Sequence, residues 1–189
     1  MVTKIRQKIR ALISDFSLTS SESFTYVTSA IFTVAESNIS ITAVTLNGVA
    51  TALYTYSSTT GKITVSASLT AGDVIEVSYT YNKYSNSELD EYIRAALVWI
   101  SIFSPSSDDY EIESNDVIVP TPDNRTCDLI AIIASILINP DYNQYRLPTV
   151  TVTYDGRIAK EQKIEKLLAK YNFGIGVSDL MTYDISPNS

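Results

Sequence analysis

Residues 74–102 read VIEVSYTYNKYSNSELDEYIRAALVWISI, and the spacing of their apolar side chains changes part-way along. From Val74 to Tyr81 apolar and polar residues alternate, which predicts a β-strand with one buried face. From Ser85 onward apolar residues recur at helical spacing, which predicts an amphipathic helix that ends at Pro105. Ser87 is a candidate N-cap residue, and carboxylates follow it in the first turn, where they favour the helix dipole. The chain therefore changes from β to α structure near residue 85.

The segment before this switch, residues 24–82, is rich in Thr, Ser, Val, Ile and Tyr and has few charges. This composition favours strands. The pairs Asn47-Gly48, Thr60-Gly61 and Gly72-Asp73 are turn signals between them. We expect six strands, at Phe24–Val27, Ile31–Val34, Ile41–Leu46, Ala52–Tyr56, Lys62–Ser66 and Val74–Tyr81. Short strands at roughly ten-residue spacing predict a small antiparallel β sandwich or barrel.

The remaining periodic segments are mostly helical. Residues 2–14 predict a short amphipathic helix, which must dock on another part of the chain to be stable. Residues 104–122 predict a loop, and Asp123 or Asn124 can cap the following helix, which is apolar on nearly every face and runs to Asn139. Residues 149–154 alternate as a short strand, and residues 157–171 predict a last amphipathic helix.

These segments predict an α+β protein in which a helical, connector-like domain of about four helices carries an inserted antiparallel β sandwich or barrel. The predicted boundaries are 1–21 together with 85–171 for the helical domain and 22–84 for the inserted β domain. Residues 172–189 show no period and predict a C-terminal tail that a partner orders. The β domain is placed as an insertion because the first helix is too short to be stable alone and its natural partners lie beyond residue 85.

The chain has no histidine and one cysteine, Cys127. The commonest general base and zinc ligand is therefore absent, and no Ser–His or Cys–His pair can form. A single cysteine excludes an intramolecular disulfide and a thiolate metal cluster. Cys127 begins the most apolar helix without a local basic cluster, so a buried structural thiol is expected. We expect no enzyme activity, no catalytic or metal-binding residues and no cofactor.

The charges are unevenly distributed, and the 14 Lys and Arg against 21 Asp and Glu give a formal net charge of −7. An acidic chain is a poor general binder of nucleic acid. The acidic run from Asp108 to Asp116 lacks the spacing of a calcium loop and is interpreted as a solvated loop or a surface for a basic partner. The basic face of the first helix is either solvated or contacts an acidic partner or DNA phosphates; it comprises Lys4, Arg6, Lys8 and Arg10.

The start of the chain does not have the pattern of a signal peptide, and no apolar run is long enough to cross a bilayer. We expect a soluble protein that is made and used in a cytoplasm.

The stretch SNSELDEYIRAALVWISI, residues 85–102, resembles the opening helix of head–tail connector (adaptor) proteins of tailed bacteriophages, and the order of the later parts is similar too. The β segment, with VTLNGV at 44–49 and VSYTY at 77–81, resembles small β modules that recur in virion proteins. The resemblance implies a structural virion protein. It would form a ring, commonly of twelve subunits, below the portal, extend the DNA channel and provide a platform for neck or tail assembly.

The resemblance also implies partners and a place of action. The partners would be further copies of the chain, the portal protein, the next neck or tail protein, and double-stranded DNA that passes through the channel without sequence-specific binding. No membrane partner is implied. The protein would be made in the host cytoplasm and reside in the virion, at the head–tail junction. The implied portal-contacting tail contains the apolar residues Tyr171, Phe173, Ile175, Val177, Leu180 and Tyr183.

Two other functions remain open. In the first, the β domain is a binding module that recognises a glycan or a host surface, since aromatic side chains on strands can stack on sugars. Its candidate residues are Tyr54, Tyr56, Tyr79, Tyr81 and Tyr84. In the second, the protein is another neck or tail-completion protein.

Overall fold

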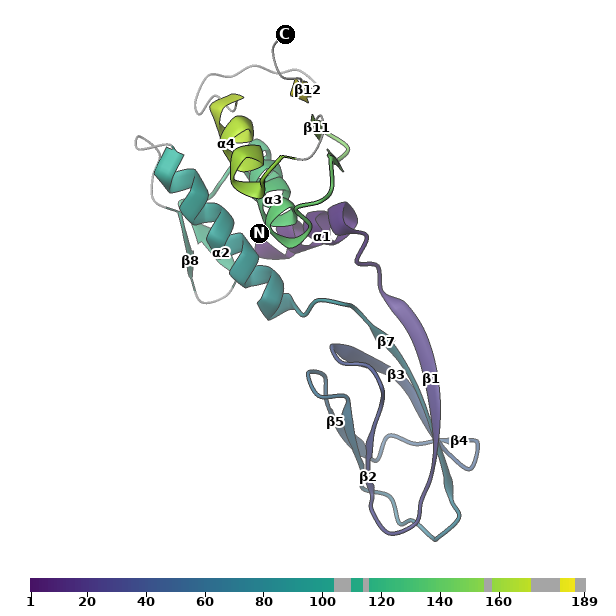
Figure 1. Ribbon diagram of the computed structural model, residues 1–189. Helices are drawn as coiled ribbons and strands as arrows, with labels where there is room; N and C mark the ends of the chain where they lie inside the picture. The colour runs from purple at the N-terminus through teal and green to yellow at the C-terminus, as the bar shows by residue number, and fades with distance from the viewer. Residues whose placement is uncertain (104–109, 114–115, 155–157, 171–180, 186–189) are drawn as a thin grey trace. The chain divides into compact units, whose positions relative to one another are not determined.

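The computed structural model describes residues 1–103, 110–113, 116–154, 158–170 and 181–185. The chain divides into two compact units. Unit 1 comprises Met1–Ser14 and Asn86–Ser189, and unit 2 comprises Asp15–Ser85. Each unit is described by itself (Figure 1).

The described part of unit 1 contains the helices α1 (Val2–Ile13), α2 (Asn86–Phe103), α3 (Asn124–Ile138) and α4 (Lys160–Lys170). Helix α3 is central, because α1, α2 and α4 all pack against it. Every residue of α3 from Thr126 to Ile136 is buried, as expected for a helix that is apolar all round. Asp123 caps α3, since its carboxylate accepts a 2.7 Å hydrogen bond from the Thr126 amide.

Unit 1 also contains two small sheets in its described residues. Strands β8 (Glu111–Glu113) and β9 (Val117–Val119) form an antiparallel pair between α2 and α3 in the sequence. Strands β10 (Gln144–Arg146) and β11 (Val150–Tyr154) pair antiparallel, and β12 (Met181–Ile185) adds to β11 in parallel. The prediction of a loop over residues 104–122 is therefore wrong at β8 and β9, and residues 181–185 form a strand within the predicted tail.

The predicted fold class is wrong. The protein is mixed α+β, with helices distributed among several small sheets, and not a helical connector domain that carries an inserted sandwich or barrel. The physical reason lies in the length of β8, β9 and β10, which have three residues each. A period of two cannot be recognised over so short a stretch, so the sequence pattern does not predict these strands.

Unit 2 contains a four-stranded sheet in the order β1-β7-β3-β4 and a three-stranded sheet in the order β2-β6-β5. The bounds are β1 Leu18–Thr25, β2 Ile31–Thr33, β3 Ile39–Leu46, β4 Val49–Ala50, β5 Tyr54–Ser57, β6 Lys62–Val65 and β7 Val74–Tyr81. The core of the unit draws on both sheets, with Phe32 and Ile63 from one and Val44, Ile75 and Val77 from the other. The alternation predicted for β7 is confirmed, since Ile75, Val77 and Tyr79 are buried.

Hydrogen bonds join the two ends of unit 2. The Asp15 carboxylate accepts a 2.8 Å hydrogen bond from the Lys83 amide, and the Asp15 carbonyl accepts a 3.2 Å bond from the Asn82 side chain. Unit 1 is interrupted between Ser14 and Asn86, and the two sides of this interruption are also joined. Arg10 of α1 donates a 3.2 Å hydrogen bond to the side chain of Asn86, which begins α2. In each unit, therefore, the points where the chain enters and leaves lie together.

Candidate functional site

The best-organised polar group of unit 1 is centred on Arg6. Its guanidinium donates to both carboxylate oxygens of Asp90, at 2.7 and 2.6 Å, and to both oxygens of Asp116, each at 2.8 Å. Planar, bidentate pairing of this kind matches the geometry of a guanidinium to that of a carboxylate. Arg6 is 9% exposed, so its charge is satisfied inside the unit.

Both carboxylates raise the pKa of Arg6, and Arg6 in turn lowers the pKa of Asp116. The hydrogen bonds donated to Asp90 are the largest cause of a raised Arg6 pKa, so the guanidinium stays charged. The hydrogen bond from Arg6 likewise lowers the pKa of Asp116. Asp116 also contacts the first residues of the chain, because its carbonyl accepts a 3.2 Å hydrogen bond from the Val2 amide. Arg6 thus fastens α1 to α2 and to the turn before β9.

The other basic residues of α1 do not join Arg6 in one exposed face. Lys8 forms a short ion pair with the buried Asp128 of α3, and Asp128 also accepts a 2.5 Å hydrogen bond from the Thr149 hydroxyl. Arg10 reaches Asn86, as described above, whereas Lys4 is exposed. The structure therefore commits Arg6 and Lys8 to contacts inside unit 1, and Lys4 is the basic side chain of α1 most open to a partner.

Sequence reasoning missed the partner carboxylates Asp90, Asp116 and Asp128. The sequence pattern places Asp90 in the first turn of its helix, and it places Asp116 in an acidic run interpreted as a solvated loop or a surface for a basic partner. The presence of a basic helix and an acidic segment in one chain is a sequence signal that their side chains form ion pairs. The sequence does not show which residues meet, because Arg6 and Asp116 are 110 positions apart.

A second buried cation belongs to α4. The Lys163 ammonium donates to the carbonyls of Pro140 and Tyr142, at 2.6 and 2.8 Å, and to the side-chain oxygen of Asn143 at 3.3 Å. Lys163 is 1% exposed, and burial lowers its pKa. It lies 5.5 Å from the centre of the Tyr154 ring, whose hydroxyl donates to the Lys163 carbonyl at 2.9 Å. These contacts hold the segment after α3 against α4.

An open groove lies between the second half of α2 and strand β8. Its volume is about 460 Å³, and it is lined by Arg94, Leu97, Val98, Ser101, Tyr110, Glu111 and Ile112. Val98 and Ile102 of α2 are 57% and 65% exposed, and Phe103 is also exposed. On the neighbouring hairpin, the exposed Val117 and Val119 of β9 lie beside Glu113 and Glu111 of β8. We call these residues of α2, β8 and β9 the acidic groove.

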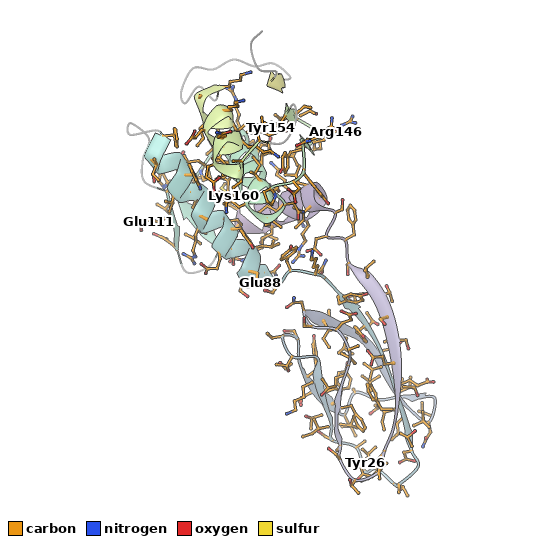
Figure 2. The ribbon with its side chains drawn as sticks, in the orientation of Figure 1. Tyr26, Glu88, Glu111, Arg146, Tyr154 and Lys160 are labelled. Carbon is orange, nitrogen blue, oxygen red and sulfur yellow. The ribbon has the colours of Figure 1, made fainter. Side chains whose placement is uncertain are left out.

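The strands on the other side of the helices carry a different surface. Figure 2 shows Glu111 and Arg146 on opposite sides of the helices of unit 1. Arg146 and Gln144 are exposed on β10, which is an edge strand of its sheet. Tyr142, just before this strand, is 43% exposed. We call Tyr142, Gln144 and Arg146 the basic edge.

One face of the four-stranded sheet of unit 2 carries mostly Ser and Thr side chains, together with the exposed Glu76. This face places Thr19, Thr80 and Ser40 in a row, and the next row has Ser21, Ser78 and Ala43. Among the candidate sugar-stacking tyrosines, Tyr79 is buried and its hydroxyl donates a short hydrogen bond to Glu22. Tyr54, Tyr81 and Tyr84 are half-buried, whereas Tyr56 is 43% exposed.

The remaining predicted site residues lie at the C-terminus. Tyr171, Phe173, Ile175, Val177 and Leu180 lie outside the described residues. Tyr183 lies in β12, opposite Val152 of β11.

Cys127 is buried, as predicted, and burial raises its thiol pKa. Among the residues that the structure describes, no group of three or more Asp, Glu, His or Cys side chains is placed to hold a metal ion. In the same part of the chain, no helix combines the length and apolar character needed to cross a membrane.

No protein-family model matches this sequence, and no curated protein matches it.

Proposed function

We propose that this protein is a structural component of a bacteriophage virion, a head–tail connector that forms a ring below the portal. In that position it extends the DNA channel and offers a platform to the next neck or tail protein. Its action is mechanical, through surfaces that bind copies of itself and neighbouring virion proteins.

The observation that carries this proposal is the exposed apolar strip of unit 1. Val98 and Ile102 are more than half exposed, and they lie beside an open groove. Contiguous apolar side chains on a surface mark a protein contact, because isolated chains gain by removing them from water. The resemblance of residues 85–102 to the opening helix of connectors supports the same function, since this helix carries the strip.

The experiment is a measurement of particle mass in solution, by light scattering, for the protein alone and after mixing with purified portal rings. Electron microscopy of the same samples then gives the shape. We expect a ring, either in the free protein or on the portal. A protein that stays monomeric alone and leaves the portal unchanged contradicts the connector function.

A second function is favoured by one observation in unit 2, the exposed Tyr56 on the edge strand β5, beside Ser and Thr side chains. We propose as the alternative that unit 2 recognises a glycan or a host surface. The burial of Tyr79 weakens this proposal, because it removes one of the candidate tyrosines. A glycan array probed with the whole protein and with the Tyr56→Ala variant tests it. Binding that this variant loses supports the alternative, and an array without binding rejects it.

A further inference from the structure

We propose that the acidic groove of one copy receives the basic edge of a second copy, so that Glu111 of the first meets Arg146 of the second. This inference rests on the proposed ring and names the surfaces through which neighbouring subunits contact each other. Both surfaces belong to unit 1, so the contact needs no particular placement of unit 2.

The charge of the groove selects a basic partner. Glu111 and Glu113 are exposed on β8, and each lies opposite an exposed valine of β9. Arg94 also lines the groove, but it lies 3.9 Å from Glu91, which is 78% exposed. Glu111 and Arg94 line the groove, Glu113 lies two residues from Glu111 on β8, and Glu91 lies next to Arg94 on α2. Together these side chains comprise three carboxylates and one guanidinium, so a segment that carries a positive charge gains there.

The apolar part of the groove selects the rest of the occupant. Leu97, Val98 and Ile112 line it, and its volume is in the range of pockets that hold a few side chains. The basic edge supplies side chains of the kinds that dominate binding at protein interfaces, a tyrosine and an arginine. Tyr142 and Arg146 are both exposed in unit 1, and Gln144 lies between them.

The strands also fit each other as backbones. Strand β8 belongs to a two-stranded sheet, so one of its edges has no strand partner in that sheet, and β10 is the end strand of its own sheet. Unpaired strand edges present amide and carbonyl groups that favour addition of another strand. Such an addition places the alternate side chains of β10 next to those of β8.

The two surfaces lie on different sides of the unit, which decides the symmetry. Glu111 and Arg146 are separated by the helices of unit 1 (Figure 2). A contact between two different patches is heterologous, so each copy that binds one neighbour keeps a free surface for the next. Repetition of a heterologous contact closes into a ring when its rotation permits. The acidic groove and the basic edge therefore supply the kind of contact that a ring requires.

A charge exchange tests the pairing. The variants Glu111→Arg and Arg146→Glu each place like charges at the contact, so we expect each alone to shift the particle mass from ring to monomer. An equal mixture of the two variants, and the double variant Glu111→Arg/Arg146→Glu, place opposite charges at every contact, so rings return. Because the mixture contains only the two single variants, its recovery also shows that both of them fold.

The matched control is Glu76→Arg, which makes the same change at an exposed glutamate of β7 in unit 2. We expect this variant to form rings like the unchanged protein. Rings that persist in both single variants overturn the proposed contact, and so does an equal loss of rings in the control. Absence of rings in the unchanged protein, alone and with the portal, is a different result, since it rejects the connector function itself.

Discussion

Arg6 and Asp90 are 84 positions apart in the chain, yet two hydrogen bonds of 2.7 and 2.6 Å join them. The side chains are 11% and 20% exposed, so the pair is largely withdrawn from water. Since Arg6 lies on α1 and Asp90 on α2, the pair joins the twelve-residue helix α1 to α2, which belongs to the second chain segment of unit 1. A helix of this length is marginal alone, so this contact accounts for part of its stability.

Replacement of Arg6 by Gln should destabilise unit 1. The change leaves Asp90 without its bidentate partner and removes both bonds to Asp116. Loss of one member of a buried pair costs about 3–5 kcal/mol, and the partial exposure of Asp90 and Asp116 lowers this to roughly 2–3 kcal/mol. The free energy of unfolding can be measured in urea through the fluorescence of Trp99, the one tryptophan, which lies on α2 of unit 1. The matched control is Arg94→Gln, whose exposed 3.9 Å contact with Glu91 predicts a loss below about 0.5 kcal/mol. Equal losses in the two variants contradict the role of Arg6.

Alkaline pH should unfold the part of unit 1 that contains strands β10 and β11, where Tyr145 and Tyr154 lie. Burial is the largest cause of the raised pKa of Tyr145 and of Tyr154. An acid whose pKa is raised in the folded state stabilises it below the ordinary tyrosine value of about 10, and this stability is lost as the pH rises through the folded-state pKa. Absorbance at 295 nm should therefore show a late phase of tyrosine ionisation that coincides with unfolding.

The variant Tyr145→Phe tests the origin of that late phase. It removes an ionising group and also the 2.7 Å hydrogen bond from the Tyr145 hydroxyl to the Asn139 carbonyl, so the amplitude of the phase should fall. Tyr56→Phe, at an exposed position, should instead remove amplitude from the early phase. A late phase that is unchanged in Tyr145→Phe assigns it to other tyrosines.

Replacement of Lys163 by Met should release the segment after α3. Three oxygen acceptors, two of them backbone carbonyls, lose the ammonium that satisfies them, at a cost of about 2 kcal/mol. Hydrogen exchange should show faster exchange of the amides of residues 142–146. Lys160→Met is the control, because Lys160 is exposed and its 3.9 Å contact is with exposed Glu161, so exchange there should stay unchanged.

Replacement of Gly61 by Ala should damage unit 2 far more than the same change at Gly72. Both glycines have positive φ, at 66° and 98°, which costs an alanine about 1 kcal/mol. At Gly61 an added Cβ would also lie 2.5 Å from the Glu36 carbonyl oxygen, whereas at Gly72 it meets nothing within 4 Å. We expect a loss of roughly 3 kcal/mol at Gly61 and about 1 kcal/mol at Gly72, measured by hydrogen exchange of the β6 amides. Equal losses contradict the steric explanation.

Sequence patterns predicted the long elements well. The four helices lie within three residues of their predicted bounds, and the strand over Val74–Tyr81 was found at both ends, because each spans enough residues for its period to be recognised. Strand β1 begins at Leu18 and not at the predicted Phe24, because its first half is mostly Ser and Thr and has no apolar alternation to mark it as a strand. The three-residue strands β8, β9 and β10 left no recognisable period, which led to the wrong fold class.

The candidate surfaces were harder to predict than the elements. Val98, Ile102 and Phe103 are exposed at the end of α2, although the helical period of this segment predicts only that one face is buried. The basic residues of α1 were noticed as a group, yet Arg6 and Lys8 turn to internal carboxylates. Which charges pair and which apolar residues stay uncovered depends on contacts between distant segments, and a single sequence does not contain that information in its local pattern.

The paired ends of the two units have an evolutionary consequence. Lys83 is bonded to Asp15 within unit 2, and Asn86 to Arg10 within unit 1. The coding sequence between codons 14 and 86 can therefore be gained, lost or replaced as one cassette, since a short peptide linker suffices to rejoin the two segments of unit 1. Recombination can then exchange unit 2 while the residues of unit 1 are inherited unchanged, which lets one scaffold carry different inserted modules.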